Sequence, residues 1–188
     1  IDSDKDPTVI LLHYPSILED TINYIPPRVK IEISCLSMDE PTELRQIRSL
    51  IGESFDGEDT DADSLARTVV PTRTFLEKLF LLAEEFQKEK PRSVRMSRHL
   101  YDLAKLMDTE YGVEALSNRT LYDAIVEHRK AYYALKYVNY DLHAPSTINF
   151  TIPESVIGAW QDDYTDMKRF FIYGESLEFE ALMQKMKE

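Results

Sequence analysis

The sequence has few glycines, one cysteine and no long apolar run. None of its five glycines belongs to a Gly-x-Gly element, which excludes the dinucleotide-binding fingerprint of Rossmann folds. Gly52 and Gly57 have phosphate-loop spacing, but Glu58 and Asp59 follow where that loop needs Lys and Ser or Thr. The longest apolar run, 79–83, covers five residues, whereas a membrane helix needs about 20. The sequence therefore excludes two common nucleotide-binding loops and predicts no membrane association.

Charge and cysteine content narrow the class of protein further. The formal net charge is −12, which opposes general binding to nucleic acid, although a local basic segment can still bind RNA. The single cysteine cannot form an internal disulfide, and the first residues carry no secretory signal pattern. The four histidines lack zinc-site spacing, and no Gly-x-Ser-x-Gly elbow occurs. We expect a folded cytoplasmic protein without structural zinc.

Residues 1–70 have the pattern of a small sheet with one helix. Residues 8–14 form a short apolar run, and residues 28–36 alternate strictly, which predicts a strand with one buried face. Apolar residues at helical spacing predict a helix over 41–51 that covers the sheet. Residues 68–70 are expected to return as a strand. The intervening acidic loop, 54–64, reads as a solvated charge run, with a cation site as the alternative.

From residue 71 onward the pattern changes to helices, which predicts a helical bundle over residues 71–188. Thr74 and Glu77 have capping-box spacing for a first helix that ends near Pro91. The other helices are expected to start near residues able to cap or open a helix: Ser97, Asn118 or Thr120, Pro153 and Ser176. The predicted fold class is α+β, with a partial sheet in residues 1–70 before this bundle.

Three polar residues stand where chemistry is plausible, each with a plainer alternative. Glu32 lies on the polar face of its strand, where a carboxylate could bind a divalent metal. The plainer alternative is an exposed glutamate beside a lysine. Lys78 borders an apolar helix stripe, where it contacts phosphate or simply extends its stem along that surface. Asp102 follows Arg98 by one helical turn, so an ordinary ion pair between them is the alternative to a catalytic role.

A basic segment, 88–99, stands out in this acidic chain. It holds five cations and one acid between Lys88 and Arg98, a contrast that is typical of an anion site, with plain surface charge as the alternative. Arg95 and Arg98 are therefore candidate substrate-binding residues. Because the segment joins the helices that carry Lys78 and Asp102, all three features are expected to face one cleft.

The order and spacing of these segments resemble the nucleotidyltransferase toxins of the AbiEii/AbiGii type, found in type IV toxin-antitoxin and phage abortive-infection systems. The resemblance covers most of the chain. It rests on RVKIEI at 28–33, PTRTFLEKL at 71–79 and SRHLYDL at 97–103, and continues through Trp160, Asp163, Tyr164 and Phe179.

The resemblance implies a polymerase-beta-like nucleotidyltransferase core followed by a helical domain. It implies transfer of a nucleotide from a magnesium-bound nucleoside triphosphate to an acceptor such as RNA, with an antitoxin protein as partner. By position, Lys78 corresponds to the lysine that contacts the triphosphate, and Asp102 to the acid of the last catalytic motif. Glu32 corresponds to a metal-binding carboxylate of the sheet. Magnesium and lysine would both stabilise charge on the phosphates.

The chain departs from the family at the opening motif. No Gly-Ser pair followed by Asp-x-Asp on a strand occurs, and the first residue is Ile rather than Met. We expect the C-terminal portion of a longer nucleotidyltransferase, which by itself holds no metal pair and does not turn over. The alternative is a non-catalytic helical module that binds a protein such as an antitoxin. That alternative rests on aromatic residues of the bundle, which are otherwise core or core-edge residues: Tyr132, Tyr133, Tyr137, Tyr140, Phe170, Phe171 and Tyr173.

Overall fold

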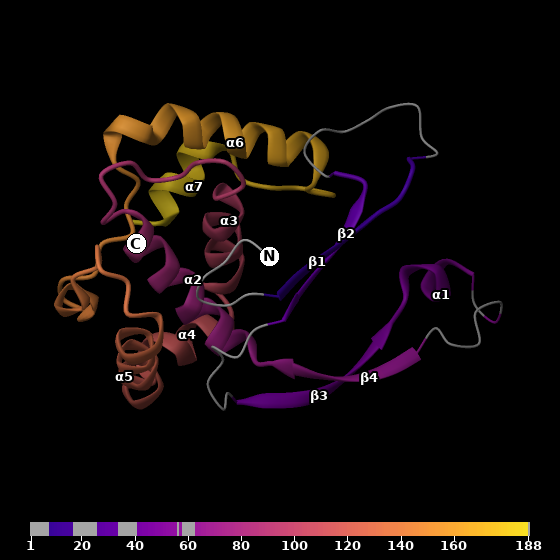
Figure 1. Cartoon of the computed structure of the whole chain (residues 1–188), viewed down its shortest axis with the longest axis horizontal. Coiled ribbons are helices and arrows are strands. Elements are labelled where there is room, and N and C mark those ends of the chain that lie inside the picture. Colours follow the sequence, from indigo (N-terminus) through magenta and orange to yellow (C-terminus); the bar gives the residue numbers. More distant parts are fainter. Residues whose placement is uncertain (1–7, 17–25, 34–40, 56, 58–62, 188) are drawn as a thin grey trace.

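The computed structural model describes residues 8–16, 26–33, 41–55, 57 and 63–187. Over these residues the chain forms two antiparallel ribbons, which extend to one side of a helical bundle (Figure 1). The predicted fold class, α+β with a partial sheet before the helices, is confirmed. Every helix in the described part of the chain is too short or too polar to cross a lipid bilayer.

Each ribbon consists of two strands. In the first, β1 (Thr8–His13) pairs with β2 (Arg28–Ile33), and the register aligns Val9 with Glu32. In the second, β3 (Thr42–Arg48) pairs with β4 (Asp63–Val69), and the register aligns Thr42 with Val69. The strands expected at 8–14 and 28–36 are thus present, although residues 34–36 lie outside the described residues.

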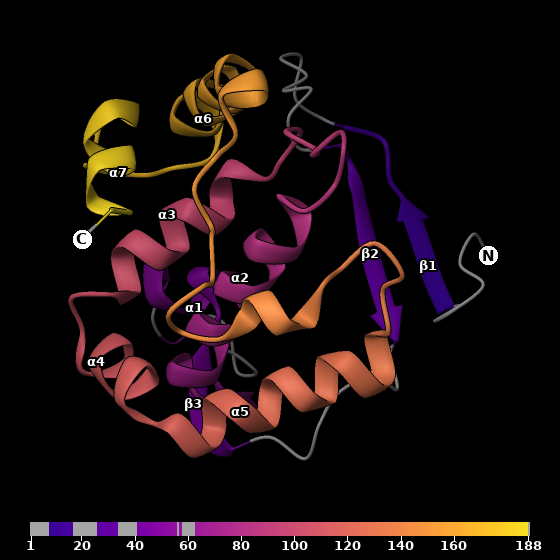
Figure 2. The same cartoon turned by 90° about the vertical axis from the view of Figure 1, so that its left-hand side faces the viewer.

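The expected buried face of β2 is absent. Val29, Ile31 and Ile33 remain 40 to 56% exposed. The strict alternation in the sequence therefore correctly indicates a strand but does not indicate that one face of it is buried. The first ribbon packs little against the bundle in the described part of the chain (Figure 2).

The helix expected over 41–51 is wrong for most of its length. Backbone pairing with β4 holds Thr42–Arg48 in an extended conformation. Leu44 and Ile47 are exposed, so no buried surface is available that would favour a helix with these residues on one face. A short helix, α1 (Leu50–Ser54), follows, and the Ser49 hydroxyl accepts a 2.9 Å hydrogen bond from the Gly52 amide. The returning strand begins at Asp63, earlier than expected. Most of the acidic loop proposed for a cation, Asp56 and residues 58–62, lies outside the described residues.

The bundle is built around one central helix, α2 (Pro71–Glu85). Its apolar stripe is fully buried at Leu76, Phe80 and Leu82. It packs against the next three helices, while the last two cover the other side of α3. Figure 2 shows α5 on the opposite side of the bundle from α6 and α7. The surrounding helices are α3 (Ser97–Leu106), α4 (Glu110–Ser117), α5 (Arg119–His128), α6 (Ile157–Phe170) and α7 (Phe179–Lys185).

Several predicted helix starts need correction. The capping box at Thr74 is wrong, because Pro71 is the first residue of α2 and the Thr74 amide already donates to the Val70 carbonyl. Ser176 does not cap α7, which begins at Phe179. Asn118 does cap α5, since its side-chain oxygen accepts a 3.0 Å hydrogen bond from the Leu121 amide. A further short helix that the sequence pattern did not predict, α4, lies between two of the expected helices.

Candidate functional site

The two residues predicted to be catalytic form an ion pair. Lys78 projects from α2 and Asp102 from α3, and the Lys78 Nζ lies 2.7 Å from Asp102 Oδ2. Both side chains are partly accessible, at 23% and 36% exposed. The alternative pairing of Arg98 with Asp102 is wrong, because Asp102 turns toward α2. Packing of α2 on α3 therefore joins two residues that are distant in the sequence.

A pocket of about 380 Å³ opens beside this pair. The C-terminal end of β4, two helices and the turn after α5 form its wall. Three cations and one carboxylate face it, which favours an anionic ligand. The lining residues are Val69, Arg73, Thr74, Glu77, Lys78, Leu81, His99, Arg129 and Tyr133.

The arginines of the pocket are fixed by two carboxylates, the buried Glu84 and the partly accessible Glu77. Arg129 donates from Nε to Glu84 Oε1 at 2.7 Å and from Nη2 to Glu84 Oε2 at 2.5 Å, and a further guanidinium nitrogen binds Glu77. Glu77 also pairs with Arg73 of the same helix. Burial would raise the pKa of Glu84, but its contacts with Arg129 and His143 outweigh burial and lower that pKa. This network holds Glu77 between two guanidinium groups.

A π-helical turn, Arg129–Tyr133, continues α5 and places Arg129 and Tyr133 at the pocket. The Arg129 guanidinium lies 4.6 Å from the centre of the Tyr133 ring, within cation–π range. Ala134 ends the turn in the left-handed region, at φ 46°. Turns of this type are frequent at functional sites, because they redirect side chains that a regular helix would turn away.

His99 is the remaining polar residue of the inner wall. It is 7% exposed, and burial, then the charges of Lys78, Arg98 and Arg92, lower its pKa to about 4. The imidazole is therefore neutral at physiological pH. Its Nδ1 atom is buried and has no hydrogen-bond partner among the described residues.

Neither of the predicted substrate-binding arginines lines the pocket. The Arg95 amide donates to Asp163 Oδ1 at 2.5 Å, and the Ser97 amide donates to Asp163 Oδ2 at 3.0 Å. Asp163 of α6 thus caps α3 from outside and fixes the preceding basic segment. Arg98 is exposed and acts on the pocket through its charge beside His99. The expectation that Lys78, Asp102 and the basic segment share one cleft is therefore met only in part. Lys78 lines the pocket and Asp102 pairs with it at the rim, whereas Arg95 and Arg98 are not among the lining residues.

Glu32 does not line the pocket, and no contact among the described residues joins it to Lys78 or Asp102. It lies on the exposed ribbon, where its carboxylate pairs with the Lys30 ammonium at 2.7 Å. Across the described ranges, no three His, Cys, Asp or Glu side chains gather as they would around a metal. Asp102 and Glu77 are each already paired with cations. The described residues therefore do not fit a two-metal site on their own.

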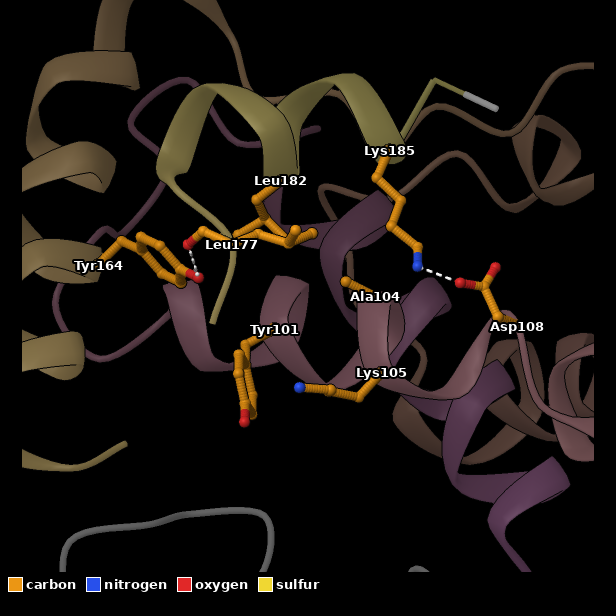
Figure 3. Close-up of a pocket in the computed structure, with 8 residues that line it drawn as sticks. All are labelled: Tyr101, Ala104, Lys105, Asp108, Tyr164, Leu177, Leu182 and Lys185. Atoms are coloured by element: carbon orange, nitrogen blue, oxygen red, sulfur yellow. Dashed lines mark hydrogen bonds and ion pairs between the residues drawn. The ribbon is translucent and has the colours of Figure 1, made fainter. Parts of the chain in front are cut away.

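A second pocket, of about 290 Å³, faces a different side of α3 (Figure 3). Its polar groups are largely matched to one another. Lys185 binds Asp108 across the opening, and the Tyr164 hydroxyl donates to the Leu177 carbonyl at 2.8 Å. Lys105 lies over the Tyr101 ring, 5.5 Å from its centre. Two lysines and one aspartate line this pocket, so its excess of positive charge is smaller than that of the pocket beside Lys78.

The aromatic residues considered for partner binding do not belong to the buried core. Tyr132, Tyr137, Phe171 and Tyr173 are exposed, and the others are half-buried. The expectation that most of them are core or core-edge residues is therefore wrong for the exposed four, while the half-buried three lie at the edge of the core. They are spread over the segment that follows α5 and over the end of α6 with the residues after it.

Sequence reasoning missed four residues of the site: Arg73, Glu84, His99 and Arg129. A signal existed for Glu84, because the acidic pair at 84–85 continues the apolar stripe of α2 where a solvated charge is not expected. His99 stood inside a quoted motif without a role. Arg129 had no local signal, because the π-turn that aims it cannot be read from spacing.

Comparison with known proteins identifies one family. A family model described as nucleotidyl transferase AbiEii toxin, type IV TA system, matches residues 1–185. No curated protein and no solved structure matches the chain significantly.

Proposed function

The chain belongs to the AbiEii family of nucleotidyl transferase toxins from type IV toxin-antitoxin systems, and from this premise we propose that Lys78 and Asp102 form its catalytic pair. In this proposal the protein transfers a nucleotide from a nucleoside triphosphate to an acceptor, with RNA as the acceptor class. The observation that carries the proposal is the ion pair between Lys78 and Asp102 at the rim of a cationic pocket.

Lys78 is suited to the triphosphate because it is cationic and partly accessible. When phosphate oxygens approach, they compete with Asp102 for the ammonium group, and the pair separates. Lys78 then stabilises the charge that develops on the departing pyrophosphate. Asp102 is released toward the reacting groups, where it accepts the proton of the acceptor hydroxyl as that oxygen bonds to the α-phosphorus and the bond to pyrophosphate breaks.

Magnesium would arrive with the nucleoside triphosphate and neutralise charge on its phosphate oxygens. The described residues do not complete a metal site, so no step of this proposal passes through the ion. The role of Glu32 as a metal ligand remains a proposal, because its carboxylate lies on an exposed ribbon and pairs with Lys30. The basic segment with Arg95 and Arg98 is our proposed contact for the RNA acceptor. These substrates place the proposed reaction in the cytoplasm, with the antitoxin as the regulatory partner.

The proposal is tested on the full gene product that contains this sequence. Labelled nucleoside triphosphates are incubated with RNA and magnesium, and incorporation is compared between the native protein and Lys78→Met or Asp102→Asn. We expect each variant to lose about 100-fold or more in rate, as is usual when one group that stabilises transition-state charge or transfers protons is removed.

The matched control is Lys105→Met, which removes an exposed lysine on α3 outside the pocket. We expect it to leave transfer unchanged. Thermal unfolding of all variants separates a lost function from a lost fold. Transfer by Lys78→Met within about threefold of the native rate would refute the role of Lys78.

A further inference from the structure

The pocket beside Lys78 contains a buried imidazole that the proposed reaction does not yet use. His99 lies on α3 one turn before Asp102 and lines the same pocket as Lys78. Only 7% of its surface is exposed, yet its Nδ1 atom has no hydrogen-bond partner in the described part of the chain. A buried polar atom without a partner is costly in a folded protein, and such atoms are often completed by a ligand.

The charges around His99 select the class of that ligand. Lys78 and Arg73 face the pocket from α2, Arg129 faces it from the π-turn, and Glu77 is the opposing carboxylate. Arg98 and Arg92 add positive charge beside the imidazole. A cationic ligand would be repelled, whereas an anionic oxygen would be attracted to this cluster.

We infer that His99 is a further anion contact of this pocket, and that its imidazole donates a hydrogen bond to a phosphate oxygen held by Lys78. This inference rests on the proposed function, because it takes the polyphosphate group of the nucleotide as the ligand. A half-turn about the χ2 torsion of His99 exchanges the two ring edges and can aim the unpartnered nitrogen at the pocket.

Anion binding and protonation of His99 are then coupled. In the free protein, burial and the neighbouring cations keep the imidazole neutral down to a pKa of about 4. A bound phosphate offsets those cations and favours the imidazolium form, so its pKa rises. Above about pH 4, where the free imidazole is neutral, the complex therefore takes up a proton on His99 that the free protein does not hold.

The test uses inorganic pyrophosphate as the probe and the full gene product as the protein. Calorimetric titration gives the affinity, and repeating it at pH 5.5 in buffers of different ionisation enthalpy gives the net protons taken up. The difference between the native protein and a His99 variant removes the contribution of the pyrophosphate itself. We expect His99→Leu to weaken pyrophosphate binding about tenfold or more, the usual effect of losing a hydrogen bond to a charged group. His99→Asn keeps a donor near the Nδ1 position, so it retains most of the affinity but takes up fewer protons than the native protein.

The control is His13→Leu, which removes an exposed histidine of β1 outside the pocket and should change neither quantity. Native affinity in His99→Leu, with binding lost in Lys78→Met, would overturn the role of His99 and leave the proposed function standing. Absence of pyrophosphate binding by the native protein would overturn both. Binding of an uncharged nucleoside with the same dependence on His99 would also overturn the inference, because the contact would then be to sugar or base.

Discussion

Replacement of Arg129 by methionine should destabilise the bundle more than any surface charge change. The Arg129 and Glu84 side chains are both 4% exposed, and three hydrogen bonds join the guanidinium to Glu84 and Glu77. Methionine keeps much of the volume but leaves the Glu84 carboxylate buried without its cation. Breaking one partner of such a pair typically costs about 3 to 5 kcal/mol. This is a large part of the roughly 5 to 15 kcal/mol that stabilises a domain.

Urea unfolding at pH 7, followed by circular dichroism, measures the effect. With a slope of about 2 kcal/mol per molar urea, the midpoint should fall by roughly 1.5 to 2.5 M in Arg129→Met. Adding Glu84→Gln to that variant removes the unpaired charge and should recover part of the loss. The control Arg119→Met breaks an exposed pair with Asp123 and should leave the midpoint nearly unchanged.

The pH dependence of the same measurement has a defined sign. The pKa of Glu84 is lowered in the folded protein, so its contribution to stability is present above the unfolded value of 4.5. That contribution is lost as the pH falls through the folded pKa, and Arg129→Met should lack this acid-dependent loss. A midpoint for Arg129→Met equal to that of Arg119→Met would refute the buried network.

Two further changes test the packing that positions the site. Gly112→Ala should destabilise by about 1 to 3 kcal/mol in thermal unfolding, because the new Cβ would lie 2.5 Å from the Leu106 carbonyl oxygen. Gly158→Ala, where no atom lies within 4 Å of the added Cβ, should instead stabilise by up to about 1 kcal/mol, and a loss in both variants would argue against the close contact at Gly112. Asp163→Asn should cost about 1 to 2 kcal/mol in urea unfolding, because the amide cannot accept from both Arg95 and Ser97, whereas the exposed neighbour Asp162→Asn should be neutral.

The sequence was most informative where structure is local. The apolar stripe of α2 and the cap at Asn118 predicted helices that the structure confirms. Lys78 and Asp102 stand beside such stripes, and a residue beside a buried stripe lies at the rim of its helix. Their positions therefore predicted two accessible groups near a helix interface, but not that they pair with each other.

The ribbons were harder to predict, because their form depends on pairing across loops. Leu44 and Ile47 have helical spacing, yet pairing with β4 holds both in a strand. Alternation in β2 correctly indicated a strand but wrongly indicated a buried face. Since an exposed ribbon gains little from burying apolar side chains, the hydrophobic pattern carries less information there than in the bundle.

The site itself combines a predictable part with an unpredictable one. Lys78, Asp102 and His99 lie on α2 and α3, whose packing is fixed by Leu76, Phe80 and Leu100 at the centre of the core. Arg129 reaches the same pocket from a π-turn and is held by a carboxylate 45 residues earlier in the chain. No local pattern specifies that distance or that turn. Because the proposed catalytic pair lies on two helices of the packed core, loss of activity in Lys78→Met with an unchanged melting temperature would indicate that the chemistry depends on the bundle.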